Sequence, residues 1–245
     1  MNNEIEKLTE ILRNSNNIVF FGGAGMSTES GIPDFRSSNG LFNEKLNLTF
    51  TPEQLVSHSF YMRYPEEFFN FYKAKLIYPN AKPNPGHIAL AKLEKIGKLK
   101  AIITQNIDGL HQDAGSKNVF ELHGSVRRNY CVKCNAFYDE NFILESNGVP
   151  TCTKCGGSVK PDVVLYEEGL DDNTIRGAVN AIANADTLII GGTSLVVYPA
   201  AGLINYFHGN NLILINKSET TADKKANLVI RDNIGKVLSN AVELL

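Results

Sequence analysis

The sequence predicts a doubly wound α/β fold built on a parallel sheet. Two features indicate this class: short apolar runs that end in glycine or polar residues, and helical patterns between those runs. An aromatic-rich stretch at about residues 37–83 and a cysteine stretch at about residues 127–160 interrupt the alternation, and we interpret both as insertions that form a smaller module. Runs that are apolar throughout are typical of strands buried on both faces. Helices that alternate with such strands give a doubly wound sheet, in which ligands bind at the carboxyl edge.

Four apolar runs are expected to form the strands of this sheet. They span residues 18–21, 101–104, 187–190 and 212–215. Apolar residues spaced three and four positions apart predict the helices that cover it. The expected helices span about residues 5–12, 86–96, 172–184 and 199–208.

Composition limits the classes of function. A chain of 245 residues can form one large domain or a domain with an insertion. Its formal net charge of −2 argues against a nucleic-acid binder, although it leaves room for a local basic patch. Residues 1–17 carry acids and amides where a signal peptide needs a basic start, and no apolar run approaches the roughly 18 residues of a membrane span. We therefore expect a cytoplasmic protein with reduced thiols.

The four cysteines fall in two Cys-x-x-Cys pairs, which predict a structural zinc site. The pairs Cys131/Cys134 and Cys152/Cys155 are separated by 17 residues. One pair can hold a metal from a tight turn, and the second completes a tetrahedron that leaves no position for water or substrate. Buried thiols or two redox pairs are the alternative, although a redox pair normally opens a helix after a strand. The chemistry is expected elsewhere in the chain.

A glycine turn after the first expected strand predicts a nucleotide-binding loop. Gly23 and Gly25 allow the backbone to approach a pyrophosphate at a helix N-terminus. The dinucleotide fingerprint is incomplete, because Thr28 replaces its third glycine and no acid ends a second strand about 20 residues later. Glu44, the nearest acid, does not end an apolar run. Hydride transfer with NAD is therefore disfavoured, and a glycine turn without a ligand remains an alternative.

Six motifs together resemble the sirtuin family of NAD-dependent protein deacylases. They are GAGMSTESGIPDFRS at 23–37, TQNIDGLH at 104–111, ELHG at 121–124, the cysteine pairs, GGTSLVVYPA at 191–200 and INKSET at 215–220. The resemblance covers nearly the whole chain and is greatest to the compact bacterial form. It implies a Rossmann-like NAD-binding domain with an inserted small module, and an acylated lysine that meets NAD in the cleft between them. The domain would comprise residues 1–36, 84–126 and 161–245, and the module residues 37–83, largely helical, and 127–160, a zinc ribbon.

The resemblance also assigns the NAD-binding residues. They are Gly23, Ala24, Gly25, Thr28, Asp34, Phe35, Arg36, Gln105, Asn106, Ile107, Asp108, His123, Gly192, Thr193, Ser194, Asn216, Lys217 and Ser218. Within this set, Asp108 is expected to accept a hydrogen bond from the nicotinamide carboxamide. An Asx turn is the alternative for Asn106 and Asp108, and a core aromatic is the alternative for Phe35.

His123 is expected to be the general base and Asn106 to act with it. A neutral imidazole can take a proton from a ribose hydroxyl near pH 7. The resemblance implies that the acyl oxygen attacks C1′ of the nicotinamide ribose, and that lysine, nicotinamide and O-acyl-ADP-ribose are the products. Structural roles are expected for His58, His87 and His208, and support of the site through hydrogen bonds for His111.

An acylated peptide is expected to add as a strand between residues 163–166 and 194–197, held by backbone hydrogen bonds. Glu167 stands where the family usually has glycine, and its carboxylate would attract basic residues beside the acyl-lysine; a solvated side chain that points away is the alternative. The expected peptide contacts are Val164, Tyr166, Glu167 and Val197.

Two other functions use some of the same residues. A protein mono-ADP-ribosyltransferase needs the NAD pocket but no base for the second attack, so the presence of His123 favours deacylation. A zinc-ribbon NAD sensor would bind NAD without releasing nicotinamide, and Asn106, Asp108 and His123 argue against it. Neutral acyl groups are favoured, because residues 68–73 lack an evident Tyr and Arg pair of the kind that selects succinyl or malonyl groups in some sirtuins.

Overall fold

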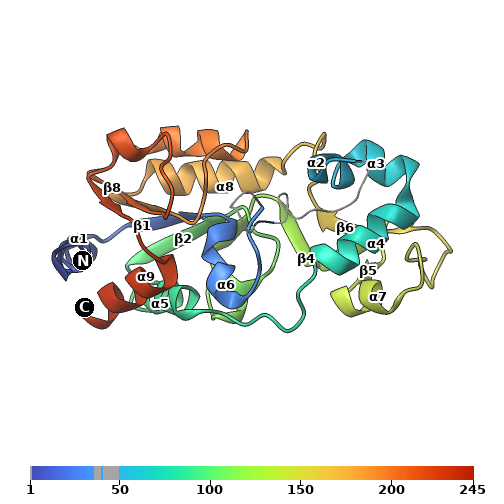
Figure 1. The fold of residues 1–245 in the computed structure, drawn as a ribbon, viewed down its shortest axis with the longest axis horizontal. Coiled ribbons are helices and arrows are strands. Elements are labelled where there is room, and N and C mark those ends of the chain that lie inside the picture. Colours follow the sequence, from blue (N-terminus) through green and yellow to red (C-terminus); the bar gives the residue numbers. More distant parts are fainter. Residues whose placement is uncertain (1, 36–39, 41–49) are drawn as a thin grey trace.

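A six-stranded parallel sheet forms the larger part of the molecule (Figure 1). The structure is a computed structural model and describes residues 2–35, 40 and 50–245. The strand order is β3-β2-β1-β7-β8-β9, and every neighbouring pair is parallel. The strands are β1 (Ile18–Gly22), β2 (Leu99–Thr104), β3 (Val119–Glu121), β7 (Thr187–Gly191), β8 (Asn211–Ile215) and β9 (Leu228–Ile230). All four predicted strands are therefore confirmed, and so is the parallel sheet.

Helices cover both faces of this sheet, because successive side chains of a strand point to opposite sides. In β1, Ile18 and Phe20 enter one apolar cluster, whereas Val19 and Phe21 enter another. Each fully buried phenylalanine contributes roughly 1.5–3 kcal/mol. The first cluster includes α1 (Asn2–Asn14), α5 (Pro85–Lys95) and α9 (Ile234–Glu243), and the second α8 (Asp172–Ala183) and the 3-10 helix η4 (Ala200–Tyr206).

The segment expected as a helix over 199–208 is a 3-10 helix over Ala200–Tyr206. Its turns close through three-residue bonds, from Gly202 N to the Pro199 carbonyl and from Phe207 N to the Ile204 carbonyl. Gly202 lowers the α-helical propensity in the middle of the segment. Apolar spacing alone does not distinguish the two helix types over so short a stretch.

The two stretches that interrupt the alternation pack together at the other end of the molecule (Figure 1). The cysteine stretch forms an antiparallel sheet in the order β5-β4-β6, and the aromatic stretch forms short helices. Phe68, Phe69 and Tyr72 are fully buried in the core that the two stretches share. The elements are α2 (Pro52–Leu55), α3 (His58–Arg63), α4 (Pro65–Lys75), β4 (Gly124–Cys131), β5 (Phe137–Tyr138), α7 (Glu140–Glu145) and β6 (Val159–Val163).

Strand β4 leads from the large sheet into the cysteine sheet, and two successive arginines on it make ion pairs with neighbouring elements. Arg127 forms a bidentate pair with Asp113 of α6 (Leu110–Asp113). Arg128 pairs with Glu121 of β3 at 2.6 Å and with Asp162 of β6 at 2.7 Å. The strand that enters the cysteine sheet is thus tied back to the large sheet.

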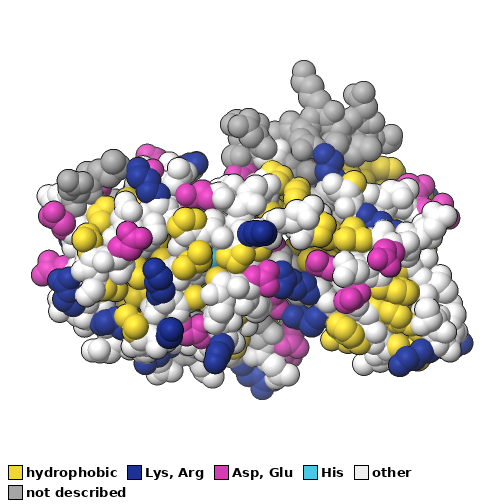
Figure 2. Space-filling view, turned by 90° about the horizontal axis from the view of Figure 1, so that it is seen from below, with side chains coloured by type: hydrophobic (Ala, Val, Ile, Leu, Met, Phe, Trp, Pro, Cys, Tyr) yellow, Lys and Arg dark blue, Asp and Glu magenta, His cyan; other side chains and the backbone are white. Residues whose placement is uncertain are grey.

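The surface matches the mixed composition of the chain. On the face shown in Figure 2, acidic and basic side chains are interspersed, in keeping with the formal net charge of −2. None of the helices in the described ranges has the length and apolar character needed to cross a bilayer.

Candidate active site

Two glycine turns meet at the carboxyl edge of the large sheet. Gly25 N donates to the Gly192 carbonyl at 2.8 Å, and a Cβ on Gly25 would lie 2.7 Å from the Gly192 Cα. Gly192 has a φ of 61°, which side chains rarely adopt. The contact places the turn after β1 against the turn after β7. Gln105, after β2, donates from Nε2 to Thr193 Oγ1 at 3.1 Å, so predicted residues from three strands lie together.

The predicted residues after β8 continue this edge. Asn216 Nδ2 donates to the Thr193 carbonyl at 3.2 Å and to the Ser218 carbonyl at 2.9 Å. Lys217, Ser218 and Ser194 are exposed. At the first turn, Thr28 Oγ1 donates to the Gly25 carbonyl at 3.0 Å, and Ala24 is half-buried. The backbone at this edge is fixed by internal hydrogen bonds, while several side chains face solvent.

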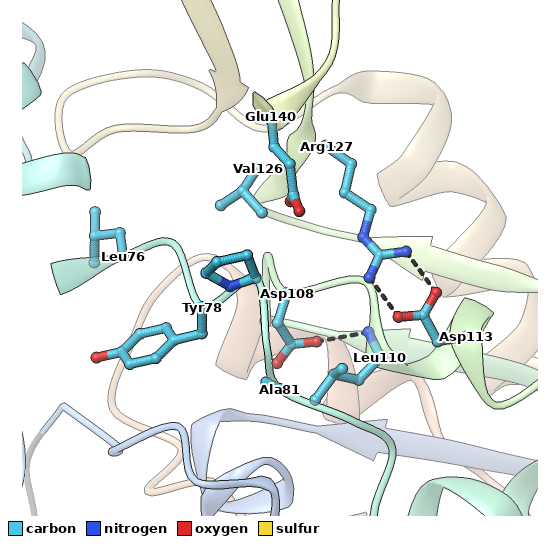
Figure 3. Close-up of a pocket in the computed structure, with 10 residues that line it drawn as sticks. Leu76, Tyr78, Ala81, Asp108, Leu110, Asp113, Val126, Arg127 and Glu140 are labelled. Carbon is cyan, nitrogen blue, oxygen red and sulfur yellow. Dashed lines mark hydrogen bonds and ion pairs between the residues drawn. The ribbon is translucent and has the colours of Figure 1, made fainter. Parts of the chain in front are cut away.

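A buried serine links the two polar residues that follow β2. Asn106 Nδ2 donates to Ser27 Oγ at 3.0 Å, and Ser27 Oγ donates to Asp108 Oδ2 at 2.6 Å. Leu110 N donates to the other carboxylate oxygen at 2.9 Å (Figure 3). Ser27 lies within the motif at 23–37, but the sequence analysis does not name it as a site residue. Its hydroxyl, next to that of Thr28, is the one feature of the sequence that could have indicated this role.

Burial raises the pKa of Asp108, opposed by the hydrogen bonds from Ser27 and Leu110 and by the positive charge of Arg127. The carboxylate therefore depends on its neighbours to stay ionised. An ionised carboxylate can accept further hydrogen bonds from a bound ligand, whereas its protonated form has one oxygen occupied as a donor.

His123 lies between β3 and β4 and is half-buried. Its Nδ1 is 2.9 Å from the Gln105 carbonyl. A carbonyl only accepts hydrogen bonds, so Nδ1 carries the hydrogen and Nε2 of the neutral ring has a free lone pair. Burial also lowers the pKa of His123, opposed by the Gln105 bond, and so the neutral ring predominates at pH 7. The arrangement suits a general base that acts through Nε2.

The loop predicted to close over the ligand is described only in part. Phe35 is half-buried and packs against the core of the two interrupting stretches, as does Ile107. Asp34 is half-buried as well. Arg36 and Glu44 lie outside the described residues. The assignment of Phe35 to a ligand stays a prediction, and its contacts agree equally with the core role that was the alternative.

We expected His111 to support the site through hydrogen bonds, and this expectation is wrong: its ring bonds to none of the described residues. Both ring nitrogens of His111 are buried without a partner among these residues. The ring packs against Phe20 of β1, with centroids 6.0 Å apart, and against His87 of α5, with centroids 4.7 Å apart. Helix α6 directs this side chain into the core, a placement that the sequence around it did not reveal.

Burial keeps both members of this histidine pair neutral. It lowers the pKa of His87 to about 4, against a smaller opposing effect of Asp113. It lowers the pKa of His111 to about 3, and His87 adds to that decrease. His87 Nδ1 accepts from Asn84 N at 3.3 Å, so its role is structural, as expected.

The segment expected to receive a peptide already pairs on one side. Tyr166 N donates to the Val56 carbonyl at 3.0 Å, and His58 N donates to the Tyr166 carbonyl at 2.9 Å. Val164 N donates to the His123 carbonyl at 3.0 Å. A peptide strand would therefore have to pair on the other side of this segment. Val197, the other expected wall residue, is half-buried.

Glu167 has a φ of 77°, a conformation that favours glycine, which explains why a glycine suits this position. Its carboxylate accepts from Ser59 N and from Ser59 Oγ, each at 2.8 Å, near the start of α3. These two bonds lower the pKa of Glu167. The Glu167 carboxylate thus has a partner within the chain. This agrees better with the alternative of a side chain that points away than with a carboxylate available to bind the peptide.

The four cysteines form a site that fits zinc. Their sulfur atoms all lie within 4.8 Å of one another, and the pairs Cys131/Cys155 and Cys134/Cys152 are 3.4 and 3.6 Å apart. Tetrahedral zinc with Zn–S bonds of about 2.3 Å places sulfurs about 3.8 Å apart, whereas a disulfide needs about 2.05 Å. The four sulfurs complete the coordination, which makes the site structural. Tyr138 Oη donates to Cys152 Sγ at 3.1 Å and supports the cluster from outside.

Comparisons with known proteins agree with this geometry. The model of the Sir2 family matches residues 23–199. An NAD-dependent protein deacetylase of Clostridium perfringens (strain 13 / Type A) is 80% identical over 244 residues, which are 99% of this chain and 100% of that protein. A protein of the same name from Clostridium acetobutylicum is 61% identical over 98% of both chains.

Solved structures extend the similarity to the fold. A Sir2 histidine variant with a deacetylated p53 peptide and 3′-O-acetyl ADP-ribose has a TM-score of 0.90 and 39% identity over 98% of both chains. A complex of Sir2, p53 peptide and NAD⁺ has a TM-score of 0.85 and 39% identity over the same shares.

Proposed function

This chain belongs to the Sir2 family, and we propose that it removes acetyl groups from lysine side chains of proteins, with NAD as co-substrate. One observation carries the proposal. At the carboxyl edge of the sheet, a half-buried histidine with a free Nε2 follows β3, and the chain of hydrogen bonds from Asn106 through Ser27 to Asp108 follows β2. A base and a polar ligand site are thus held at the ends of neighbouring strands.

NAD is assigned along this edge, from the residues that follow β2, across the two glycine turns, to the residues that follow β8. The turn at Gly23, Ala24 and Gly25 faces the pyrophosphate, with Thr28 behind it. The groups that follow β7 and β8 hold the adenosine half, and those that follow β2 hold the nicotinamide half. The first set is Gly192, Thr193, Ser194, Asn216, Lys217 and Ser218. The second is Gln105, Asn106, Ile107 and Asp108, together with Asp34 and Phe35.

The reaction follows from what these groups can do. When bound, NAD would supply C1′ of its ribose, at which the acyl oxygen would displace nicotinamide. A ribose hydroxyl would then attack the acyl carbon, and with one water the acyl C–N bond would break, so that free lysine and O-acyl-ADP-ribose are formed. The Asp108 carboxylate accepts from the carboxamide of nicotinamide and orients it. The Gln105 carbonyl holds the His123 ring in the tautomer whose Nε2 is free. His123 Nε2 then takes a proton from a ribose hydroxyl, and the zinc site takes no part because its ligand set is complete.

The acylated peptide is assigned to the backbone edge between residues 163–166 and 194–197. Val164 and Val197 would line it, with Tyr166 and Glu167 beside the flanking residues. The pairing of Tyr166 with the 56–58 loop supports this placement, because it holds the segment extended on its opposite side.

We also infer the division of labour within the chain. Residues 1–36, 84–126 and 161–245 would carry NAD, and residues 37–83 and 127–160 would form the second wall of the site. A zinc site of four thiolates needs reduced cysteines, which favours the cytoplasm.

The test is mass spectrometry of an acetyl-lysine peptide incubated with the zinc-loaded protein, with and without NAD. Loss of the acetyl group only with NAD, together with appearance of acetyl-ADP-ribose, is the expected result. A peptide that gains ADP-ribose and keeps its acetyl group would favour the mono-ADP-ribosyltransferase. Nicotinamide that is never released would instead favour an NAD sensor.

A further inference from the structure

An arginine of β4 packs against the residue that follows Asp108 and lines the same cavity as the Asp108 side chain. Arg127 of β4 crosses the backbone at Gly109, the residue after Asp108 (Figure 3). Gly109 has a φ of 73°, and a Cβ there would lie 2.5 Å from Arg127 Nε. Arg127 Nε is buried without a hydrogen-bond partner among the described residues, so packing over Gly109 holds this part of the side chain.

Among the described residues that line a small cavity, Arg127 is the one with a positive charge. The cavity has a volume of about 50 Å³, and the carboxyl groups of Asp108, Asp113 and Glu140 line it together with Arg127 (Figure 3). Arg127 Nη1 donates to Asp113 Oδ1 at 2.6 Å, and a second bond joins the same two groups. One positive charge therefore faces three acidic groups.

We propose that Arg127 is a positioning residue for the deacetylation reaction, which keeps the Asp108 carboxylate ionised and in place to accept from the carboxamide of nicotinamide. The proposal rests on the role assigned to Asp108 above. Arg127 would act in two ways, through its charge and through its contact with the Gly109 backbone.

The charges around Asp108 support the electrostatic part. Arg127 favours the ionised form, whereas Asp113 of α6 and burial oppose it. Glu140 of α7 interacts with Arg127, and His87 of α5 with Asp113. Because the pKa of His87 is about 4, this ring stays neutral over the range in which enzymes are assayed. Ser27 and Leu110 add neutral donors. Without Arg127, the acidic groups lose their cation, and Asp108 would bind a proton at higher pH.

The experiment measures nicotinamide inhibition of the zinc-loaded enzyme from about pH 5.5 to about pH 8. We define the acid limit as the pH at which half of the inhibition is lost on acidification. In Arg127→Met, this acid limit should rise by about half a pH unit to one pH unit. Nicotinamide should then bind about 3- to 10-fold more weakly below the acid limit and nearly normally at the alkaline end. Arg128→Met is the matched control: it removes the next arginine, which pairs with Glu121 and Asp162, and should keep the wild-type profile. His123 is unchanged in both variants, so its titration cancels in the comparison.

Two further variants separate charge from packing and from the role of Asp108. Asp113→Asn combined with Arg127→Met removes a charge of each sign, and should move the acid limit back toward that of wild type. An Arg127→Met profile identical to wild type would overturn the proposal, and so would a double variant no closer to wild type than Arg127→Met. Asp108→Asn should weaken inhibition at every pH. Normal inhibition in Asp108→Asn would instead remove the role assigned to Asp108, on which the proposal rests.

Discussion

The cysteine cluster and the carboxyl edge of the six-stranded sheet both gather reactive side chains, and they differ in how completely those side chains are used. The four sulfurs lie within 4.8 Å of one another and suffice for the four ligands of a tetrahedral zinc ion. At the sheet edge, His123 is bonded through Nδ1, and its Nε2 has no hydrogen bond to any residue that the structure describes. A metal site whose ligand positions are all filled stabilises the fold. A catalytic side chain, in contrast, must be fixed by one hydrogen bond and keep another atom available to the substrate.

Removal of one zinc ligand should have the largest effect, because metal binding energy in such sites is folding energy, about 10 kcal/mol or more. Cys152→Ala is expected to lose zinc, melt at a lower temperature and lose activity with its fold. Metal analysis, thermal melting and turnover check this. Val132→Ala changes an exposed residue between the other two cysteines, Cys131 and Cys134, and should behave as wild type. A zinc-free Cys152→Ala protein that melts normally and turns over fully would end the structural assignment.

Loss of the base should affect the rate and spare the fold. His123→Ala is expected to reduce deacetylation about 100-fold or more, the usual scale for a positioned general base, while NAD still binds. Kinetics and NAD titration by calorimetry separate the two. The exposed His208, changed to Ala, serves as the control. Deacetylation within a few-fold of wild type in His123→Ala would mean that another group is the base.

The buried histidine pair should set the acid stability. The pKa values of His87 and His111 in the folded protein, about 4 and about 3, lie below the unfolded value of 6.5. The unfolded chain therefore binds more protons as the pH falls, and stability is complete above about pH 6.5 and is lost below it. At pH 5 each histidine should cost about 2 kcal/mol.

Urea unfolding at about pH 5 and about pH 7 measures this loss. His111→Leu, which packs against the same neighbours, should lose less stability between the two values than wild type does. The exposed His208→Gln should follow wild type. An equal loss in His111→Leu and wild type would assign the acid sensitivity to other groups.

The smallest effect is expected at Glu167, whose carboxylate is engaged by Ser59. Peptides with basic flanks should be preferred over acidic ones by less than about threefold, as is usual for exposed charges. The ratio of kcat/KM for the two peptides, at low and high salt, measures the preference. Glu167→Gln is the matched variant and should change the ratio little. A large preference that disappears in Glu167→Gln and at high salt would restore the role that the sequence predicted.

The sequence predicted the centre of the sheet better than its rims. The run at 18–21 is apolar throughout because both faces of β1 are buried, and the pattern follows directly from that burial. Strands β3 and β9 have only three residues each, too few for a period to show. The helix expected at 199–208 has the right spacing but three-residue turns.

In the candidate site, motifs located the loops but left the direction of individual side chains open. Ser27 joins Asn106 to Asp108 through contacts between separate loops, which no local pattern encodes. His111 follows a polar motif and yet faces the core. The left-handed backbone at Glu167 is likewise invisible from a glutamate in the sequence.

The hydrogen bond from Val164 N to the His123 carbonyl joins two parts of the proposed mechanism. Val164 belongs to the segment assigned to the peptide, and His123 is the assigned base. This single backbone hydrogen bond thus fixes the distance between the segment assigned to the substrate and the residue assigned as the proton acceptor. In the proposed mechanism, peptides of different sequence would therefore bind along this edge at the same distance from the base.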